Sequence, residues 1–202
     1  MKKENKIEIP YKKKKMIGAA LKLLKSPKKV MILDYDGKEL NSIFGFKEDL
    51  KHMKLPFKLI FIYLIKLYIQ LPLFNIMRHS EGLLKIKIYK HFGMNIGKNV
   101  FIGGGVYIDD TFPELISIGE GSIVGKDVTI FSHEATIKHM RFGKVKIGKQ
   151  VLIGANSIIR SGVTIGDGAV IAMDSLVIKD VPAMEEWGGV PARKIKKLRK
   201  LI

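Results

Sequence analysis

The sequence from residue 147 to residue 182 reads IGKQVL IGANSI IRSGVT IGDGAV IAMDSL VIKDVP, which is a period of six. The same period occurs earlier, in IGKNVF, IGGGVY and IDDTFP from Ile96 and in IGEGSI, VGKDVT and IFSHEA from Ile118. All twelve of these hexads begin with Ile or Val, and seven of them have Gly in second place. A period of six fits neither an ordinary helix nor a simple alternating strand.

The repeat predicts short strands, of about six residues each, that are separated by sharp corners. One branched aliphatic side chain per strand would point into a narrow interior, and glycine at the corner avoids a Cβ clash where the backbone turns. A single coil cannot bury its own aliphatic side chains, so successive coils stack and their backbones pair in parallel. With three hexads per coil, we expect a mainly β fold, a parallel β-helix of about four coils.

The rest of the chain differs from the repeat in composition. Residues 1–94 are basic and are predicted to be largely helical, residues 95–182 form the β-helix, and residues 183–202 form a C-terminal tail. Apolar patterns in the first of these regions favour three helices. They are expected over residues 16–25, 55–70 and 83–91.

The net charge of +17 is concentrated outside the repeat. Residues 1–94 hold 21 Lys and Arg against 8 Asp and Glu, whereas residues 95–182 hold 9 of each kind. A nucleic-acid-binding platform would carry its cations on the folded column, so this distribution argues against nucleic acid as a partner. The absence of cysteine excludes disulfide bridges, thiolate metal clusters and cysteine nucleophiles.

The basic start of the chain shows no cleavable signal peptide, which is typical of a cytoplasmic protein. The longest apolar segment, residues 57–77, is interrupted by Lys58, Lys66, Gln70 and Pro72, which argues against a membrane-spanning helix. Two interpretations of this segment remain open. It either contacts an anionic membrane surface peripherally, or packs against its own protein or a neighbouring subunit.

The last six hexads, followed by GGVPARKI at residues 188–195, resemble the hexapeptide-repeat acyltransferases. Among these, the chain looks most like the sugar and xenobiotic O-acetyltransferases that use acetyl-CoA, and the resemblance covers residues 91–198. It implies a left-handed β-helix, a homotrimer with active sites between subunits, and acetyl-CoA as co-substrate without a metal. The period of six alone implies neither the handedness nor the trimer.

His133 is the candidate general base. It occupies the fourth position of IFSHEA, just before the longer break in the repeat at residues 136–146. A loop that leaves a rigid column forms one wall of a cleft, so we expect a histidine beside that loop to line the cleft. The resemblance implies the same residue as the base. A neutral imidazole can remove the proton of an acceptor hydroxyl at physiological pH. For the group that orients the ring, Glu134 and a backbone carbonyl remain equal alternatives.

The resemblance also implies which residues meet the acetyl donor. The backbone N–H of Ala155 would stabilise the oxyanion. Cations in the last coils and the tail would hold the phosphates of coenzyme A, although a solvated corner or a tail salt bridge is an alternative for them. Met173 stands where the family often has a small residue beside the pantetheine arm. The cofactor-binding set is Ala155, Met173, Lys179, Arg193 and Lys196.

Asp109 and Asp110, in YIDD, resemble an acidic pair that meets sugar hydroxyls in acetyltransferases of this type. An insertion follows directly in the sequence, so two exposed corner aspartates are an equally good interpretation. On the first interpretation both carboxylates would bind the acceptor.

These observations predict an acetyltransferase that acts on a hydroxyl of a sugar or glycan precursor, by direct attack without a covalent intermediate. Acetylation of an amino-sugar nitrogen is a close alternative. A γ-type carbonic anhydrase would need a third histidine about two coils before a His pair, but no histidine occurs between Asn95 and Ser132. The repeat alone would also permit a non-enzymatic β-helix that serves as an assembly platform.

Overall fold

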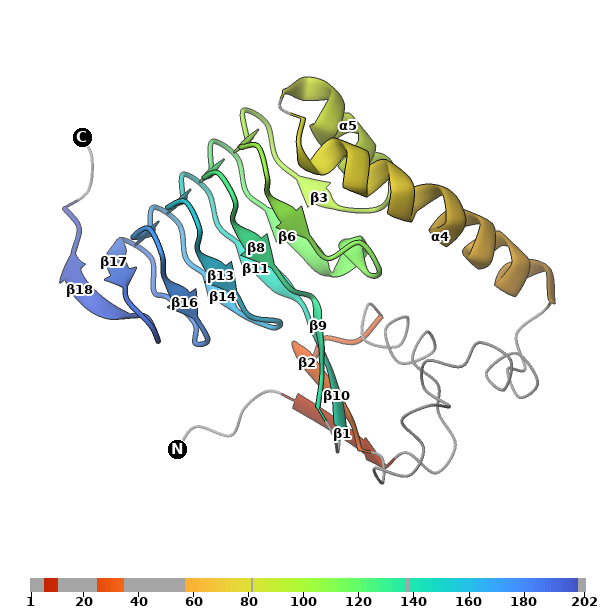
Figure 1. Ribbon diagram of the computed structural model, residues 1–202. Coiled ribbons are helices and arrows are strands. Elements are labelled where there is room, and N and C mark those ends of the chain that lie inside the picture. Colours follow the sequence, from red (N-terminus) through yellow and green to blue (C-terminus); the bar gives the residue numbers. More distant parts are fainter. Residues whose placement is uncertain (1–5, 11–24, 35–56, 81, 137–138, 200–202) are drawn as a thin grey trace.

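The computed structural model describes residues 6–10, 25–34, 57–80, 82–136 and 139–199, and these form a three-sided parallel β-helix with a helical cap (Figure 1). Four coils stack along the column, as the repeat predicts, and each contributes one short strand to each of three parallel sheets. One side holds β3 (Asn95–Ile96), β6 (Ile116–Ile118), β11 (Val145–Ile147) and β14 (Thr164–Ile165). The second holds β4 (Phe101–Ile102), β7 (Ile123–Val124), β12 (Leu152–Ile153) and β15 (Val170–Ile171). The third holds β5 (Tyr107–Ile108), β8 (Thr129–Ile130), β13 (Ile158–Ile159) and β16 (Leu176–Val177).

The interior of the column is the aliphatic ladder that the repeat predicts. Every first residue of the twelve hexads is buried, with at most 5% of its surface exposed. The strands themselves are shorter than expected, because only two or three residues per hexad pair with the neighbouring coils and the rest form the corner. The buried first residues are Ile96, Ile102, Ile108, Ile118, Val124, Ile130, Ile147, Ile153, Ile159, Ile165, Ile171 and Val177.

Glycine at the corners follows from the close approach of successive coils. A Cβ atom on Gly119 would lie 2.4 Å from the carbonyl oxygen of Gly148, and one on Gly154 would lie 2.5 Å from the backbone nitrogen of Met173. Both distances are well below van der Waals contact, so a side chain there would push the coils apart.

The chain leaves the column twice. The first excursion follows β5 and contains the short 3₁₀-helix η2 (Pro113–Leu115). The second follows β8 and forms an antiparallel hairpin of β9 (His133–Ala135) and β10 (His139–Gly143), which projects from the lower edge of the column in Figure 1. Both excursions begin at the same edge of the prism, because β5 and β8 are neighbours in one sheet.

The projecting hairpin pairs with strands from the beginning of the chain. β2 (Val30–Asp34) runs antiparallel to β10, and β1 (Lys6–Pro10) runs parallel to β2. β2 thus extends the sheet of the hairpin, and its residues Val30 and Met31 are buried. The sequence analysis did not predict these two strands, because they are stabilised by a distant hairpin edge that local sequence does not reveal.

Two helices cap the first coil. α4 (Phe57–Arg78) begins within two residues of the expected helix but continues beyond Pro72, and α5 (Leu83–His91) confirms the expected helix residue for residue. Pro72 removes one backbone donor, yet Phe74 packs edge-on against Tyr89 and Phe92, and this contact holds the following turns in place. Of the helix expected over residues 16–25, all but the last residue lies outside the described part of the chain.

A buried lysine fastens this helical cap to the column. The ammonium of Lys85 donates to the carbonyl oxygens of Arg78 and Ser80 at the end of α4 and of Gly103 in the first coil, at 2.8–3.2 Å. A cation is favoured there because the last carbonyls of a helix carry partial negative charge. None of the helices in the described residues is both long and apolar enough to span a membrane. At the other end of the column, β17 (Glu185–Gly188) and β18 (Arg193–Lys197) form a hairpin that extends the second sheet.

Candidate active site

His133 lies at the column edge where both excursions begin. Its ring nitrogen Nδ1 is 2.5 Å from a carboxylate oxygen of Asp109, which directly follows β5 in the preceding coil. The carboxylate can only accept a hydrogen bond, so Nδ1 carries the proton and the second ring nitrogen, Nε2, keeps its lone pair. The side chain of His133 is 26% exposed and that of Asp109 is fully buried. The pair therefore presents a proton acceptor to solvent and hides the group that orients it.

Asp109 is itself fixed by the backbone around it. One carboxylate oxygen accepts from the N–H groups of Ser132 and His133, each at 2.9 Å, and the other accepts from the N–H of Thr111 at 3.1 Å. These bonds compensate for the burial of a charged group. The carboxylate is thus a rigid anchor for the imidazole.

Two phenylalanine rings hold the imidazole from its sides. Phe112, from the first excursion, meets His133 edge-on with ring centroids 5.5 Å apart. Phe142, from β10, lies nearly parallel to His133 at 6.3 Å and also contacts Phe112. Both phenylalanines are fully buried. The imidazole therefore has little freedom to rotate away from the direction that Asp109 sets.

Burial and charge act in opposite directions on this pair. Burial alone would lower the pKa of His133, but the hydrogen bond and the charge of Asp109, with smaller contributions from Asp110 and Glu134, raise it above the ordinary value. Burial alone would raise the pKa of Asp109, whereas the hydrogen bond and the charge of His133 lower it. Asp109 is therefore an anion that makes the imidazole a stronger base than a free histidine side chain.

The structure corrects two expectations about the neighbours of His133. Asp109 was expected to bind the acceptor, but its carboxylate is buried and engaged by four donors, so it orients His133 instead. Neither Glu134 nor a backbone carbonyl holds the ring. Glu134 points away, as strand alternation requires, and accepts hydrogen bonds from Arg160 and Ser161 at 2.7–3.2 Å.

Asp110 faces a cavity of about 400 Å³ between α4, α5 and the first coil. Burial, followed by the charge of Asp109, raises the pKa of Asp110 above its ordinary value. The guanidinium of Arg78 lies 5.5 Å above the ring of Tyr107 in the cavity wall, and burial raises the pKa of Tyr107 to about 12. The cavity combines an aromatic surface with a carboxyl and a guanidinium, and its Asp110 end is next to the anchor of His133.

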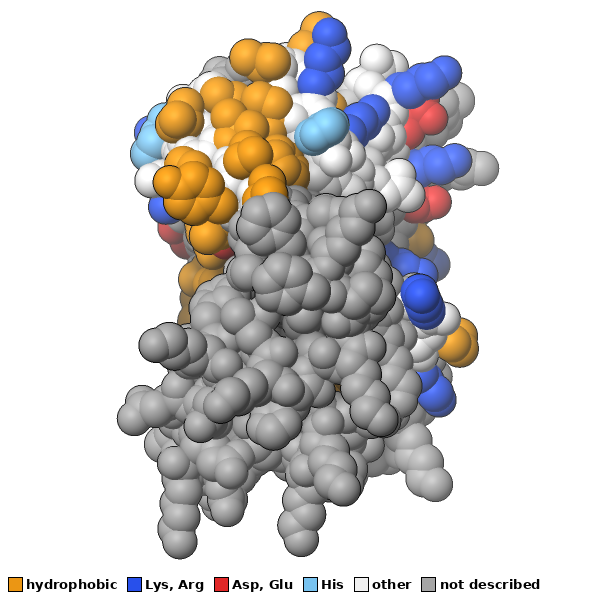
Figure 2. Space-filling model, turned by 90° about the vertical axis from the view of Figure 1, so that its right-hand side faces the viewer, with side chains coloured by type: hydrophobic (Ala, Val, Ile, Leu, Met, Phe, Trp, Pro, Cys, Tyr) orange, Lys and Arg blue, Asp and Glu red, His pale blue; other side chains and the backbone are white. Residues whose placement is uncertain are grey.

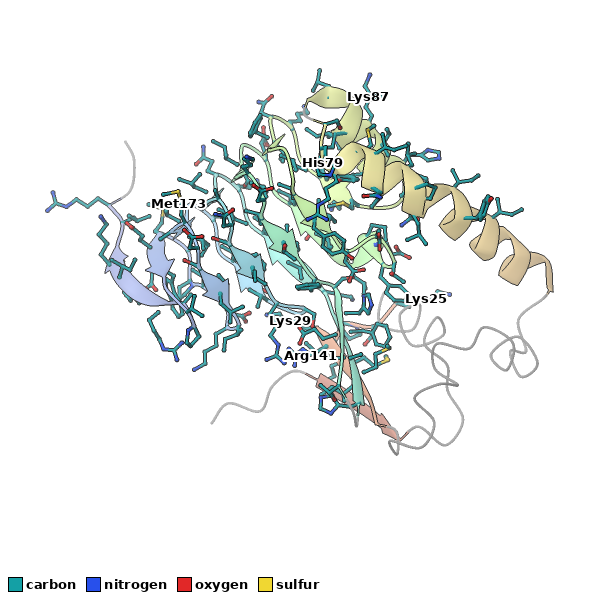
Figure 3. All side chains as sticks on the ribbon, viewed as in Figure 1. Lys25, Lys29, His79, Lys87, Arg141 and Met173 are labelled. Atoms are coloured by element: carbon teal, nitrogen blue, oxygen red, sulfur yellow. The ribbon has the colours of Figure 1, made fainter. Side chains whose placement is uncertain are left out.

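Ala155 and Met173 lie together at another edge of the prism. They occupy successive coils at the corner that precedes the third sheet, and the N–H of Asp174 donates to the carbonyl of Ala155 at 2.9 Å. His133 follows the third sheet, so it is at the opposite edge of that sheet. Figure 3 shows Met173 on the upper side of the column, whereas Arg141 of the hairpin lies on the lower side. A single chain therefore does not bring His133 and Ala155 together.

The cationic residues expected to bind coenzyme A lie in two different parts of the chain. Lys179 follows β16 and lies at the same edge of the prism as His133, two coils further along. Arg193 and Lys196 belong to β18, where Lys196 is paired with Glu186 at 3.1 Å. All three lysine and arginine side chains are exposed. Their exposure is compatible with binding phosphates, and their contact with a ligand stays a prediction.

Sequence reasoning did not identify Phe112, Phe142 or the anchoring role of Asp109. The signal that was available is the alternation of the hairpin, since Phe142 is the register partner of His133 across β9 and β10. No group of three His, Asp or Glu side chains that could share a metal ion occurs among the residues that the structure describes.

The comparisons with known proteins agree with this architecture. A family model described as the hexapeptide repeat of succinyl-transferase matches residues 144–177. YvoF of Bacillus subtilis, which is provisionally named an acetyltransferase, is 46% identical over 113 residues, covering 55% of this chain and 66% of its own length. The galactoside O-acetyltransferase of Escherichia coli is 32% identical over 120 residues, covering 55% of this chain and 58% of its own length. The chain thus spans about 60% of the length of these curated relatives.

Solved structures show the fold. A hexapeptide-repeat-containing acetyltransferase from Vibrio cholerae, complexed with acetyl-coenzyme A, is similar with a TM-score of 0.57 and 22% identity, covering 70% of this chain and 90% of that chain. A galactoside acetyltransferase in complex with coenzyme A gives a TM-score of 0.54 and 23% identity, covering 68% and 82% of the two chains. The column is therefore a left-handed parallel β-helix, as expected.

Proposed function

Because this chain belongs to the hexapeptide-repeat family of left-handed β-helix proteins, we propose that it transfers an acetyl group from acetyl-CoA to a hydroxyl of a sugar or glycan precursor. The observation that carries the proposal is the His133–Asp109 pair, in which a buried carboxylate holds a half-buried imidazole in the tautomer of a base. The names of the relatives support acetyl transfer, and that of the Escherichia coli relative supports a sugar hydroxyl as acceptor.

In the proposed reaction, Nε2 of His133 removes the proton of the acceptor hydroxyl as its oxygen attacks the thioester carbonyl. The oxygen–carbon bond forms, the carbon–sulfur bond breaks, and the proton held by His133 passes to the leaving thiolate. Asp109 stabilises the imidazolium that forms in between, and Phe112 and Phe142 keep the ring aligned. The chain has no cysteine, which fits direct transfer without a thioester on the enzyme.

The second half of the site would come from a neighbouring subunit. His133 and Ala155 occupy different edges of one prism, so a trimer of columns side by side is the arrangement that could place the two residues in one cleft. In that cleft the backbone N–H of Ala155 would stabilise the negative charge on the carbonyl oxygen. We propose this homotrimer with its active sites between subunits.

The residues expected to hold coenzyme A fit an extended anionic ligand. Met173 is 69% exposed beside Ala155, where it can contact an apolar arm, and Lys179, Arg193 and Lys196 are exposed cations. Lysine and arginine are the usual partners of phosphate groups. On the acceptor side, the cavity with Asp110, Tyr107 and Arg78 offers the aromatic surface and polar groups that a sugar ring requires.

Replacement of His133 by alanine tests the proposal. Wild-type protein is screened with acetyl-CoA against a panel of sugars, nucleotide sugars and amino sugars, with release of free thiol as the measurement. We expect His133→Ala to lower kcat by about 10²–10⁴-fold, because a positioned general base contributes that much. Coenzyme A binding, measured by calorimetry, should be unchanged. Equal turnover by the variant and the wild type would contradict the assignment of the base.

The same panel separates the two acetylation alternatives. A hydroxyl acceptor gives an ester product that hydroxylamine cleaves, whereas an amino-sugar nitrogen gives an amide that resists it. We expect the ester. Absence of turnover with every acceptor, together with no binding of coenzyme A, would favour the non-enzymatic platform.

A further inference from the structure

The helical cap carries an apolar surface that faces away from the column. Tyr68, Ile69 and Ile76 of α4 are 83%, 54% and 66% exposed, and Leu83 and Leu84 at the start of α5 are 77% and 62% exposed. Figure 2 shows hydrophobic side chains gathered in the upper part of this face of the molecule, with basic and His side chains nearby. We call this patch the cap face, defined by Ile65, Tyr68, Ile69, Ile76, Leu83 and Leu84.

The cap face is separate from the surface that α4 uses to pack on the column. Gln70 and Phe74 are buried against the first coil, whereas residues 65, 68, 69 and 76 share the opposite side of the helix. α4 is therefore apolar on both sides, and among the described residues only the side of Gln70 and Phe74 is buried. A contiguous exposed apolar surface of this kind marks a site that contacts another protein or a membrane.

The described charged side chains beside the cap face are positive. Between Asp49 and Asp109 the sequence contains a single acidic residue, Glu81, and nine lysines and arginines. His79 after the end of α4, and Lys87 and Lys90 on α5, are exposed beside the apolar residues. Figure 3 shows His79 and Lys87 at the two helices of the cap. The occupant of this face must therefore combine negative charge with an apolar layer.

We propose that the cap face is a docking surface for an anionic phospholipid membrane. The apolar side chains of α4 and α5 would enter the boundary between headgroups and acyl chains, and Lys87 and Lys90 would contact the anionic headgroups. Tyr68 has the amphipathic ring that is favoured at this depth. A second copy fits less well, because a symmetric contact would bring two sets of these cations together without acidic partners.

Docking in this orientation places the first coil, and with it the cavity of Asp110, near the bilayer. The inference does not depend on the proposed acetyl transfer, since its test measures binding alone. It gives a role to Lys87 and Lys90, two of the cations that lie outside the repeat.

Vesicle flotation with matched charge variants tests the inference. The full chain is mixed with vesicles of pure phosphatidylcholine, or with vesicles that also contain about 30 mol% phosphatidylglycerol, at about 0.1 M salt. We expect flotation only with the anionic vesicles. Lys87→Glu with Lys90→Glu should lower the partition coefficient by at least about tenfold. The control, Lys146→Glu with Lys149→Glu on the exposed column surface, makes the same change in net charge and should retain binding.

Equal loss in both double variants would overturn the inference, because it would mean that a chain of net charge +17 binds anionic vesicles without a defined face. No flotation of the wild type would overturn it as well. A triple variant, Tyr68→Ser with Ile76→Ser and Leu83→Ser, separates lipid from a second copy. We expect it to lose flotation at unchanged sedimentation coefficient; a reduced sedimentation coefficient with full flotation would assign the face to another subunit.

A single label measures the depth of insertion. The chain has no cysteine, so Ile76→Cys or Lys149→Cys introduces one site for an environment-sensitive fluorophore. On anionic vesicles the label at residue 76 should brighten several-fold and shift to the blue, and the label at residue 149 should not change. Identical responses at the two positions would contradict the proposed orientation.

Discussion

The column and its two excursions are stabilised in different ways. In the column each coil repeats the contacts of the next, so an Ile or Val of one coil lies over the Ile or Val of another and no single contact is unique. In the excursions each contact occurs once: Asp109 with His133, Phe112 with Phe142, and β2 with β10. The difference teaches that the repeat supplies a rigid support, whereas the departures from it supply the chemistry.

The largest loss of stability is expected for a substitution in the column, and it should leave the catalytic rate unchanged. Ile153→Ala removes a fully buried side chain from the third coil and should lower the free energy of unfolding by about 2–5 kcal/mol. The catalytic rate of the folded fraction at low temperature should not change, because Ile153 belongs to the second sheet, whereas both excursions follow strands of the third. Lys146→Ala, on the exposed side of a neighbouring strand, should stay within about 0.5 kcal/mol of wild type in the same denaturant titration.

The second prediction concerns the hydrogen bonds by which Lys85 holds the helical cap on the column. Lys85→Met keeps the volume of the side chain but leaves the carbonyls of Arg78, Ser80 and Gly103 without this donor, so we expect a loss of about 2 kcal/mol in the free energy of unfolding. Lys87→Met, on the exposed side of α5, is the matched control. If both variants unfold at the same denaturant concentration, the buried ammonium does not stabilise the cap.

The third prediction concerns a smaller loss of stability, and it tests whether Phe142 aligns the imidazole of His133 or only stabilises the fold. Phe142→Leu in the hairpin and Phe92→Leu in the cap each remove an aromatic ring from a buried contact, and each should cost about 1–1.5 kcal/mol of stability. We expect kcat to fall several-fold only for Phe142→Leu, since only that ring lies beside the imidazole. Equal kcat values for both variants would mean that Phe142 does not align His133.

The sequence was sufficient to predict the column because the same six-residue pattern occurs twelve times. The position of every inward-facing Ile and Val follows from the period of six, and each corner glycine is required by the coil beside it. The location of His133 could also be predicted, since a polar residue beside a break in the repeat has few structural roles. These are inferences from local pattern.

Contacts between non-repeating segments could not be predicted in the same way. Asp109 and His133 are 24 residues apart, and the path of the first insertion determines whether their side chains meet. β2 pairs with a hairpin more than a hundred residues away in sequence, and β1 pairs with β2, so nothing in their own residues shows the hairpin as partner. Pro72 normally ends a helix, but the aromatic packing of Phe74 supports α4 beyond it.

The pH dependence of turnover tests most directly the central claim, that Asp109 makes His133 the base. A general base works only when it is deprotonated, so kcat/KM should fall as the pH drops through the raised pKa of His133. Asp109→Asn removes the negative charge that stabilises the imidazolium, which lowers the pKa of His133. We predict that kcat/KM of this variant falls by about 100-fold at pH 8 and that its acid limb moves to lower pH. An acid limb at the same pH in wild type and Asp109→Asn would contradict the account.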